Sequence, residues 1–316
     1  MPTVMKRILV IRHGAFGDLI QCNGALADIR SFHMDAEITL LTSPAFQSLM
    51  SRCPYVDEVI TDGRVPLSRI RAHLALRRAL RSLKFDRVYD LQNSDRTALY
   101  KMFFLRDIPW SVTTGTVPKT EPDTQRYYYQ LQAAGVPVIH TLEPDVSWMA
   151  EDVSQILADA NVRHPYIALI PGCSVRHQHK RWPFYPQLAE GLIAQGYDIV
   201  TVLGPEELDL AKLIPGHVLK GKTGFLSWFQ LAGVLKSAHF VVGNDTGPCH
   251  LAACLGTAGL ALFGSSTTPK RTGILRQHFD AIAVPDLTLL SPKDVLSATL
   301  ARLNQMGRQI KSPGDA

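Results

Sequence analysis

The sequence predicts an α/β protein of two domains, each built on a parallel sheet with helices on both faces, that face each other across a ligand cleft. The chain of 316 residues is longer than one hydrophobic core usually serves. Short β-branched apolar runs alternate with amphipathic segments of helical length, as in parallel sheets covered by helices. This alternation breaks once, at 142–148, and then restarts. We therefore expect domains at 1–145 and 146–316, the second one including the last helix.

The expected elements follow that alternation in order. The first half predicts strands at 7–12, 38–42, 56–61 and 87–91, with helices at 19–30 and 67–83. The second half predicts strands at 166–170, 198–203, 239–242 and 259–263, with helices at 185–194, 228–237, 248–255 and 292–304. Ligands of such sheets bind at the carboxyl ends of the strands. We expect the site there, in the cleft between the domains.

Composition and charge limit the class of protein. Hydrophobic residues make up 46% and charged residues 19%, which is typical of a globular chain and not of a disordered one. No apolar run approaches the roughly 20 residues of a membrane span, and the run at 8–11 is too short for a signal peptide. We expect a cytoplasmic protein whose five scattered cysteines are reduced. The net charge of +5 favours an anionic partner: a phosphorylated substrate, an acidic glycolipid, a membrane surface or nucleic acid.

The first motif lies where the first strand runs into the first helix. Residues 12–18 read Arg-His-Gly-Ala-Phe-Gly-Asp, and Gly14 and Gly17 let the backbone turn tightly beside a ligand. Asp18 is expected at the start of the helix, facing the cleft. The alternative is that Asp18 is a plain N-cap. The glycines do not form Gly-x-Gly-x-x-Gly, which disfavours a nicotinamide dehydrogenase.

A second motif, Gly-Asn-Asp-Thr-Gly-Pro-Cys-His at 243–250, follows an apolar strand. Pro248 suits the first helical position. The N–H groups of Thr246, Gly247 and the first helical turn are then expected to bind an anion, with a diphosphate as the expected ligand. Asp245 would accept a hydrogen bond from a sugar hydroxyl or orient the loop amides. The alternative is an ordinary strand–turn–helix junction with His250 packed in the core.

Two further strand ends carry charged side chains. The basic residues Arg176, His177, His179, Lys180 and Arg181 suit phosphate contacts, or else form a solvated loop. Glu206 and Glu207 suit the hydroxyl pair of a ribose, or else occupy the first turn of a helix. His177 and His179 lack a third ligand nearby, and the sequence has no Asp-x-Asp pair, so we expect no metal site.

The segment 64–87 combines basic and apolar residues. Its apolar residues are expected to form a stripe that faces the core, with the cations on the opposite face. That cationic face is either solvated or in contact with acidic lipid or glycolipid. The apolar residues are Leu67, Ile70, Leu74, Leu76, Leu80 and Leu83, and the cations are Arg64, Arg69, Arg71, Arg77, Arg78, Arg81, Lys84 and Arg87.

Taken together, these motifs resemble the heptosyltransferases of glycosyltransferase family 9. Residues 7–12 with 16–18 resemble the start of that family, and 85–92 resembles its Tyr-Asp-x-x-x-Asp-x-Gln strand. Residues 180–183 resemble its Lys-x-Trp-Pro, 245–250 its Asp-Ser/Thr-Gly-x-x-His donor motif, and 264–269 the loop that follows. The sequence departs from the family at Asn23-Gly24, where many members have a proline, and at Ser265, where proline is usual.

The resemblance implies a GT-B fold of two Rossmann-like domains, the first binding the acceptor and the second the donor. It implies an inverting glycosyltransferase, with no metal or cofactor, that moves a heptose or related sugar from a nucleotide-diphosphate sugar, expected to be ADP-heptose, to a lipopolysaccharide core precursor. The implied partners are this donor and an anionic glycolipid, without nucleic acid; contact with the inner membrane stays open. The implied catalytic base is Asp18, the donor residues are Lys180, Glu206, Glu207, Asp245, Thr246, Gly247 and His250, and the acceptor-side residues are Gly17, Asn93 and Arg96.

Other functions stay open at this point. One alternative is another GT-B enzyme, either a transferase with a different donor or a sugar-nucleotide epimerase, which would act on the donor without any acceptor. A non-catalytic protein that binds sugar nucleotides or glycolipids is a further alternative. It would bind the donor and turn over no acceptor.

Overall fold

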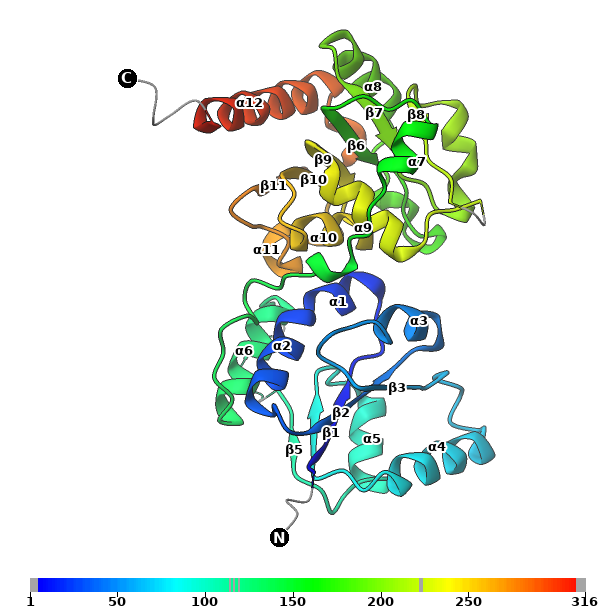
Figure 1. Ribbon diagram of the computed structural model, residues 1–316, viewed down its shortest axis with the longest axis vertical. Coiled ribbons are helices and arrows are strands. Elements are labelled where there is room, and N and C mark those ends of the chain that lie inside the picture. The colour runs from blue at the N-terminus through cyan, green and yellow to red at the C-terminus, as the bar shows by residue number, and fades with distance from the viewer. Residues whose placement is uncertain (1–4, 114, 116, 119, 222–223, 311–316) are drawn as a thin grey trace. The chain divides into compact units, whose positions relative to one another are not determined.

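The computed structural model describes residues 5–113, 115, 117–118, 120–221 and 224–310 (Figure 1). The chain forms two compact units, Met1–Trp148 (unit 1) and Met149–Ala316 (unit 2), whereas the sequence analysis places the boundary after Asp145. Each unit has one sheet, and all strand pairs of both sheets are parallel. The predicted α/β class with two parallel sheets is therefore confirmed. No helix in the described part of the chain combines the length and the apolar character that crossing a membrane requires.

Unit 1 has a five-stranded sheet in the order β3-β2-β1-β4-β5. Its strands are β1 (Arg7–Ile11), β2 (Glu37–Thr42), β3 (Glu58–Thr61), β4 (Arg87–Asp90) and β5 (Trp110–Ser111). The helices are α1 (Phe16–Gln21), α2 (Asn23–Phe32), η1 (Pro44–Phe46), α3 (Gln47–Met50), α4 (Ile70–Ser82), α5 (Asp95–Phe103) and α6 (Asp123–Ala133). Leu9 and Ile11 of the central strand pack with Leu80 of α4 and Tyr100 of α5. Helices α2 and α6 lie together on the other side of the sheet (Figure 1).

Unit 2 has a six-stranded sheet in the order β11-β10-β9-β6-β7-β8. Its strands are β6 (Tyr166–Ile170), β7 (Asp198–Thr201), β8 (His217–Val218), β9 (Phe240–Asn244), β10 (Gly259–Phe263) and β11 (Phe279–Ala283). The α-helices are α7 (Ser154–Asp159), α8 (Tyr185–Ala194), α9 (Trp228–Ser237), α10 (Gly247–Cys254), α11 (Pro269–Thr272) and α12 (Pro292–Ile310). The 3₁₀ helices are η3 (Val175–Lys180), η4 (Pro205–Lys212) and η5 (Leu287–Leu289), with η2 (Ser147–Met149) at the boundary between the units. The last helix, α12, packs against α8, where Leu296 lies against Gly191.

Several elements differ from the sequence prediction. The single helix predicted at 19–30 is two helices, α1 and α2, which meet at Cys22. The edge strands β5 and β8 have only two residues each, too short to give a periodic signal. The sequence analysis does not predict β11, because this strand lies at the edge of the sheet and four of its five residues are partly buried or exposed, so it lacks the continuous apolar run of a central strand.

The prediction that one apolar stripe of α4 faces the core is wrong for its first half. Leu80 is fully buried, and Leu76 and Leu83 pack beside it. By contrast, Ile70 and Leu74 are exposed, as is Leu67 in the preceding loop. At about 100° per residue, Ile70 and Leu74 lie on a different side of the helix from Leu76 and Leu80. The spacing therefore contains two apolar groups, and only one of them reaches the core.

A buried polar network joins the carboxyl ends of β1 and β3 to α5. His13 follows β1, and its Nε2 lies 3.1 Å from Oδ2 of Asp62, which follows β3. The Tyr100 hydroxyl donates a hydrogen bond to the same oxygen at 2.5 Å, and Arg96 on α5 donates to the Val65 carbonyl at 2.8 Å. Burial by itself raises the pKa of Asp62, but the interactions with His13 and Tyr100 outweigh it and lower that pKa to about 2. The folded unit therefore favours ionised Asp62.

Asp62 should make the stability of unit 1 depend on pH. Its folded pKa of about 2 lies below the ordinary 3.8, so the carboxylate stabilises the fold above about pH 4, and this contribution is lost as the pH falls towards 2. At 1.36 kcal/mol per pKa unit, Asp62→Asn should lower the free energy of unfolding by about 2 kcal/mol at pH 7 and by much less near pH 2. Urea unfolding across this pH range measures the difference, with the exposed Asp35→Asn as control. If the difference in unfolding free energy between the wild type and Asp62→Asn does not change with pH, Asp62 does not have the lowered pKa.

Candidate active site

Arg12 organises the carboxyl end of β1 in unit 1. Its side chain is only 5% exposed, yet its guanidinium makes several polar contacts. It lies 3.0 Å from Asp18 Oδ2 and 2.8 Å from Asp123 Oδ2, and it donates a hydrogen bond to the Leu91 carbonyl at 2.8 Å. A buried guanidinium is tolerated only when its charge and its N–H groups are paired. Arg12 therefore fixes Asp18, and Asp18 in turn helps to satisfy Arg12.

Asp18 is the third residue of α1, and the N-cap is Ala15. Asp18 is therefore not the N-cap that the alternative describes. Asp18 still has a structural role, because its Oδ2 accepts a hydrogen bond from the Ala15 amide at 2.9 Å, as in half of a capping box. Both contacts, with Arg12 and with Ala15, use Oδ2. The side chain is 45% exposed. The result is a carboxylate that is held in place and accessible to a solute, as a general base must be.

The predicted acceptor-side residues are partly engaged within unit 1. Gly17 precedes Asp18 in α1. Asn93 donates through Nδ2 to the Asp90 carbonyl at 2.6 Å and accepts through Oδ1 from the Thr113 amide at 2.7 Å. Arg96 belongs to the Asp62 network. Asn93 and Arg96 therefore shape the loops at the carboxyl edge of the sheet, whatever they contact beyond it.

Three of the predicted donor residues meet in unit 2. Lys180 ends η3, Asp245 follows β9, and His250 lies on α10. The Lys180 ammonium is 2.5 Å from Asp245 Oδ2, and His250 Nε2 is 3.4 Å from Oδ1. Asp245 is buried, which alone raises its pKa, but the hydrogen bonds from His250 and Lys180 outweigh burial and hold that pKa below its ordinary value. The ionised Asp245 thus links a basic loop to a helix start.

Helix α10 begins directly after this cluster. Thr246 is its N-cap and Gly247 its first residue. Pro248 is therefore the second residue of the helix, whereas the sequence analysis predicts it as the first. The first turn of a helix presents N–H groups without intrahelical partners, and the helix dipole adds a partial positive charge there. Together with Lys180, this is a suitable environment for an anion such as a diphosphate.

Asn244 is a central residue of this region that the sequence analysis did not single out. It is fully buried at the end of β9. Its Oδ1 accepts hydrogen bonds from the Trp182 amide and the Tyr185 hydroxyl, both at 3.1 Å, and its Nδ2 donates to the Pro171 carbonyl at 2.8 Å. Asn244 therefore ties β9 to the loops that follow β6 and η3. The sequence feature that could have identified Asn244 is its side-chain amide, which is the one polar side chain at the end of the apolar run of β9.

Glu207 behaves as the helix-start alternative describes. Its Oε2 accepts a hydrogen bond from the Gly204 amide at 2.8 Å, in the first turn of η4. Its carboxylate also lies against Gly172, where an added Cβ would stand 2.0 Å from Oε1. Gly172 is therefore needed to admit this carboxylate beside the loop that Asn244 holds. The side chain of Glu206 lies outside the described residues.

In the described ranges of the chain, no group of three or more His, Cys, Asp or Glu side chains is arranged to hold a metal ion.

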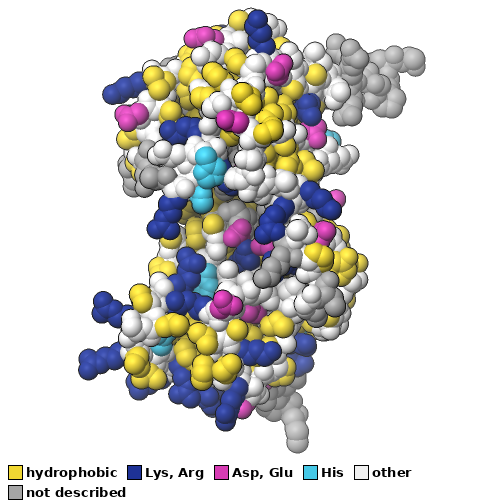
Figure 2. Space-filling view, turned by 180° about the vertical axis from the view of Figure 1, so that it is seen from behind, with side chains coloured by type: hydrophobic (Ala, Val, Ile, Leu, Met, Phe, Trp, Pro, Cys, Tyr) yellow, Lys and Arg dark blue, Asp and Glu magenta, His cyan; other side chains and the backbone are white. Residues whose placement is uncertain are grey.

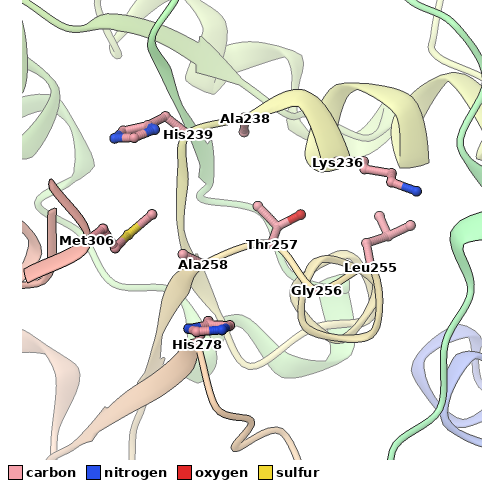
Figure 3. A pocket seen from close by; sticks show the side chains of 9 residues that line it. All are labelled: Lys236, Ala238, His239, Leu255, Gly256, Thr257, Ala258, His278 and Met306. Carbon is pink, nitrogen blue, oxygen red and sulfur yellow. The ribbon is translucent and has the colours of Figure 1, made fainter. Parts of the chain in front are cut away.

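Unit 2 also has a pocket that lies apart from the Lys180–Asp245–His250 cluster. The pocket has a volume of about 560 Å³ and is lined by residues that include Lys236, His239, Thr257, His278 and Met306 (Figure 3). Several of these residues directly precede β9, β10 and β11. The pocket thus lies at the amino edge of the sheet, whereas Asp245 lies at the carboxyl edge.

The matching family model and the relatives found by sequence agree on one family. The model of glycosyltransferase family 9 (heptosyltransferase) matches residues 111–292. Lipopolysaccharide heptosyltransferase 2 of Salmonella typhimurium is 25% identical over 301 residues, which cover 83% of each chain. The crystal structure of the glycosyl transferase family 9 from Veillonella parvula superposes with a TM-score of 0.78 at 20% identity, covering 95% of this chain and 97% of that one. The structure of E. coli heptosyltransferase WaaC with ADP superposes with a TM-score of 0.72 at 20% identity, covering 94% of this chain and 99% of that one.

The similar structures concern the fold, and the family model concerns the family. The structural matches confirm the predicted GT-B-like fold. The family match covers more than half of the chain and includes Lys180, Asn244 and Asp245, while Asp18 precedes it. The chain therefore belongs to glycosyltransferase family 9, the heptosyltransferase family, and is a glycosyltransferase.

Proposed function

We propose that this glycosyltransferase moves a heptose or a related sugar from ADP-heptose to a lipopolysaccharide core precursor, with inversion at the anomeric carbon. The Lys180–Asp245–His250 cluster at the start of α10 carries this proposal, because it offers a cation and a helix N-terminus to a diphosphate. Two similarities support the choice of substrates. The similar E. coli protein was solved with ADP, and the Salmonella relative is named for lipopolysaccharide.

On the donor side, which we assign to unit 2, charge develops on the diphosphate as its bond to C1 breaks. Hydrogen-bond donors that are already in place stabilise this transition state more than they stabilise the bound ground state. Lys180 has three N–H donors: one contacts Asp245 Oδ2 at 2.5 Å, a second reaches the Asp245 carbonyl at 3.5 Å, and the third is left for the diphosphate. Asp245 then orients the ammonium for the diphosphate, and Thr246 and Gly247 supply backbone amides. Glu206 and Glu207 are proposed to bind the ribose hydroxyls, Glu207 through Oε1, since its Oε2 already accepts a hydrogen bond from the Gly204 amide.

On the acceptor side, which we assign to unit 1, a sugar hydroxyl attacks C1 from the face opposite the diphosphate. Asp18 takes the hydroxyl proton as the new C–O bond forms, and Arg12 keeps the carboxylate in position. The products are the extended acceptor, the nucleotide diphosphate and a protonated Asp18. Gly17, Asn93 and Arg96 are proposed to shape the surface that the acceptor meets. The acceptor is an anionic glycolipid at the cytoplasmic face of the inner membrane, where we place the protein.

An assay of ADP release tests this function directly. We expect release that requires both ADP-heptose and a heptose-free core acceptor, and that persists in EDTA because α10 and Lys180 stabilise the leaving group. UDP-, GDP- and CDP-sugars should stabilise the protein less than ADP-heptose, which at 100 times its Kd should add about 2.7 kcal/mol to the free energy of unfolding.

Three outcomes contradict the proposal. Loss of activity in EDTA that Mg²⁺ or Mn²⁺ restores would require a metal-dependent mechanism. Conversion of the donor without any acceptor would favour an epimerase or a hydrolase. Donor binding without turnover on any core acceptor would favour a binding protein.

Lys180→Ala tests the donor site itself. Removal of one charge-assisted hydrogen bond should weaken donor binding by about 1.5–3 kcal/mol, on the order of 10- to 150-fold in Kd. Calorimetry with ADP-heptose measures this change, and the melting temperature shows whether the fold is intact. Lys293→Ala, an exposed cation on α12, is the matched control and should bind as the wild type does. An unchanged Kd for a folded Lys180→Ala removes Lys180 from the site.

A further inference from the structure

Unit 1 exposes a group of large apolar side chains around α4 and the end of α5. They are Leu67 (61% exposed), Ile70 (66%), Leu74 (55%), Met102 (60%) and Phe103 (58%). The two helices meet here, because Arg77 donates a hydrogen bond to the Phe103 carbonyl at 3.1 Å and Arg81 donates to the Phe104 carbonyl at 3.3 Å. We call this surface the α4–α5 patch. Single exposed apolar residues are ordinary, but several together mark a surface that is covered by something else.

The α4–α5 patch is also strongly cationic. The segment 63–84 holds seven Arg and Lys residues and no Asp or Glu. Arg77 and Arg81 help to hold α4 on α5, whereas Arg69, Arg71 and Arg78 are exposed. Lys101 adds an exposed cation near the end of α5, whereas Arg106 is paired with Asp107 at 3.3 Å. Lys, Arg and hydrophobic side chains lie side by side on the lower part of Figure 2, which unit 1 forms.

The apolar residues of the patch are not needed to hold α4 in place. The helix is anchored through Leu80, which is fully buried, and through Leu76, which packs beside it. Ile70 and Leu74 lie on another side of the same helix and contribute little to that core. Their exposure in water is unfavourable, at roughly 25 cal/mol per Å² of apolar surface. A partner that covers them would therefore gain binding energy without competing with the fold.

We propose that the α4–α5 patch docks on an anionic lipid bilayer, with Leu67, Ile70 and Leu74 entering the boundary between headgroups and acyl chains. A bilayer offers anionic headgroups to the arginines and an apolar layer to the leucines and isoleucine at the same time. A nucleic acid would pair the cations and leave the apolar side chains in water. This inference rests on the surface of unit 1 alone and does not depend on the transfer reaction.

Co-sedimentation of the full chain with lipid vesicles tests the docking surface. Wild-type protein should bind vesicles of phosphatidylcholine mixed with phosphatidylglycerol, and bind poorly to phosphatidylcholine alone. Added salt should weaken binding, since exposed charges are screened over about 10 Å at 0.1 M. The triple variant Arg69→Gln, Arg71→Gln, Arg78→Gln should lose on the order of fivefold in partitioning per charge, about 100-fold in all. The double variant Ile70→Ser, Leu74→Ser tests insertion and should also bind clearly less well.

A matched control replaces three exposed cations of unit 2, as Lys212→Gln, Lys220→Gln, Lys293→Gln, and should bind vesicles nearly as the wild type does. ADP-heptose binding by both patch variants should be unchanged, which separates a failure of the docking surface from a failure of the proposed function. Equal binding to neutral and anionic vesicles overturns the proposal, and so does full binding by the Ser variant. Concentration-dependent dimers in sedimentation that the Ser variant abolishes would assign the patch to a second copy of this chain instead.

Discussion

A polar side chain that is buried at the carboxyl end of a parallel strand must find its partners there, and this constraint shapes the candidate functional residues of each unit. Arg12 directly follows β1 and is paired with Asp18, Asp123 and the Leu91 carbonyl. Asn244 ends β9 and holds two neighbouring loops. Leaving such groups unpaired would cost several kcal/mol each. The loops that carry the chemistry are therefore fixed by the same bonds that stabilise the fold.

This constraint changes how the two aspartates are understood. From sequence, a cap and a base were alternatives for Asp18. In the structure its Oδ2 serves Arg12 and the Ala15 amide, and a carboxylate has a second oxygen with lone pairs of its own. A structural role and a proton-accepting role are therefore compatible. Asp245 likewise is a buried anion whose charge is balanced by Lys180 and His250. In the proposed mechanism its part is to position Lys180.

The sequence predicts best those elements that are buried throughout. Strands β6 and β10, in which every residue is buried, have the predicted bounds, and the buried strands β7 and β9 differ from the prediction by only one or two residues at an end. The first half of α4 is not core, although the sequence analysis treats its apolar residues as one stripe, because Ile70 and Leu74 lie on a different side of the helix from Leu76 and Leu80. Within the site, the sequence places Lys180, Asp245 and His250 together among the donor residues, but their direct contact depends on the pairing of β6 with β9. The roles of Asn244 and of the His13–Asp62 pair depend on long-range contacts that local patterns do not encode.

The turnover of Asp18→Asn tests the central claim, that a carboxylate fixed by Arg12 removes the acceptor proton, most directly. The amide nearly keeps the shape of the side chain and can still accept the Ala15 hydrogen bond, and Asp123 still balances the charge of Arg12, so the melting temperature should stay close to that of the wild type. Asp18→Ala, by comparison, loses its contacts with both the Ala15 amide and Arg12, and should lower the free energy of unfolding by at least about 1 kcal/mol. The account predicts that Asp18→Asn lowers kcat by about 10²- to 10⁴-fold while the Kd for ADP-heptose changes only a few-fold. A folded Asp18→Asn that keeps near-wild-type turnover would contradict the mechanism.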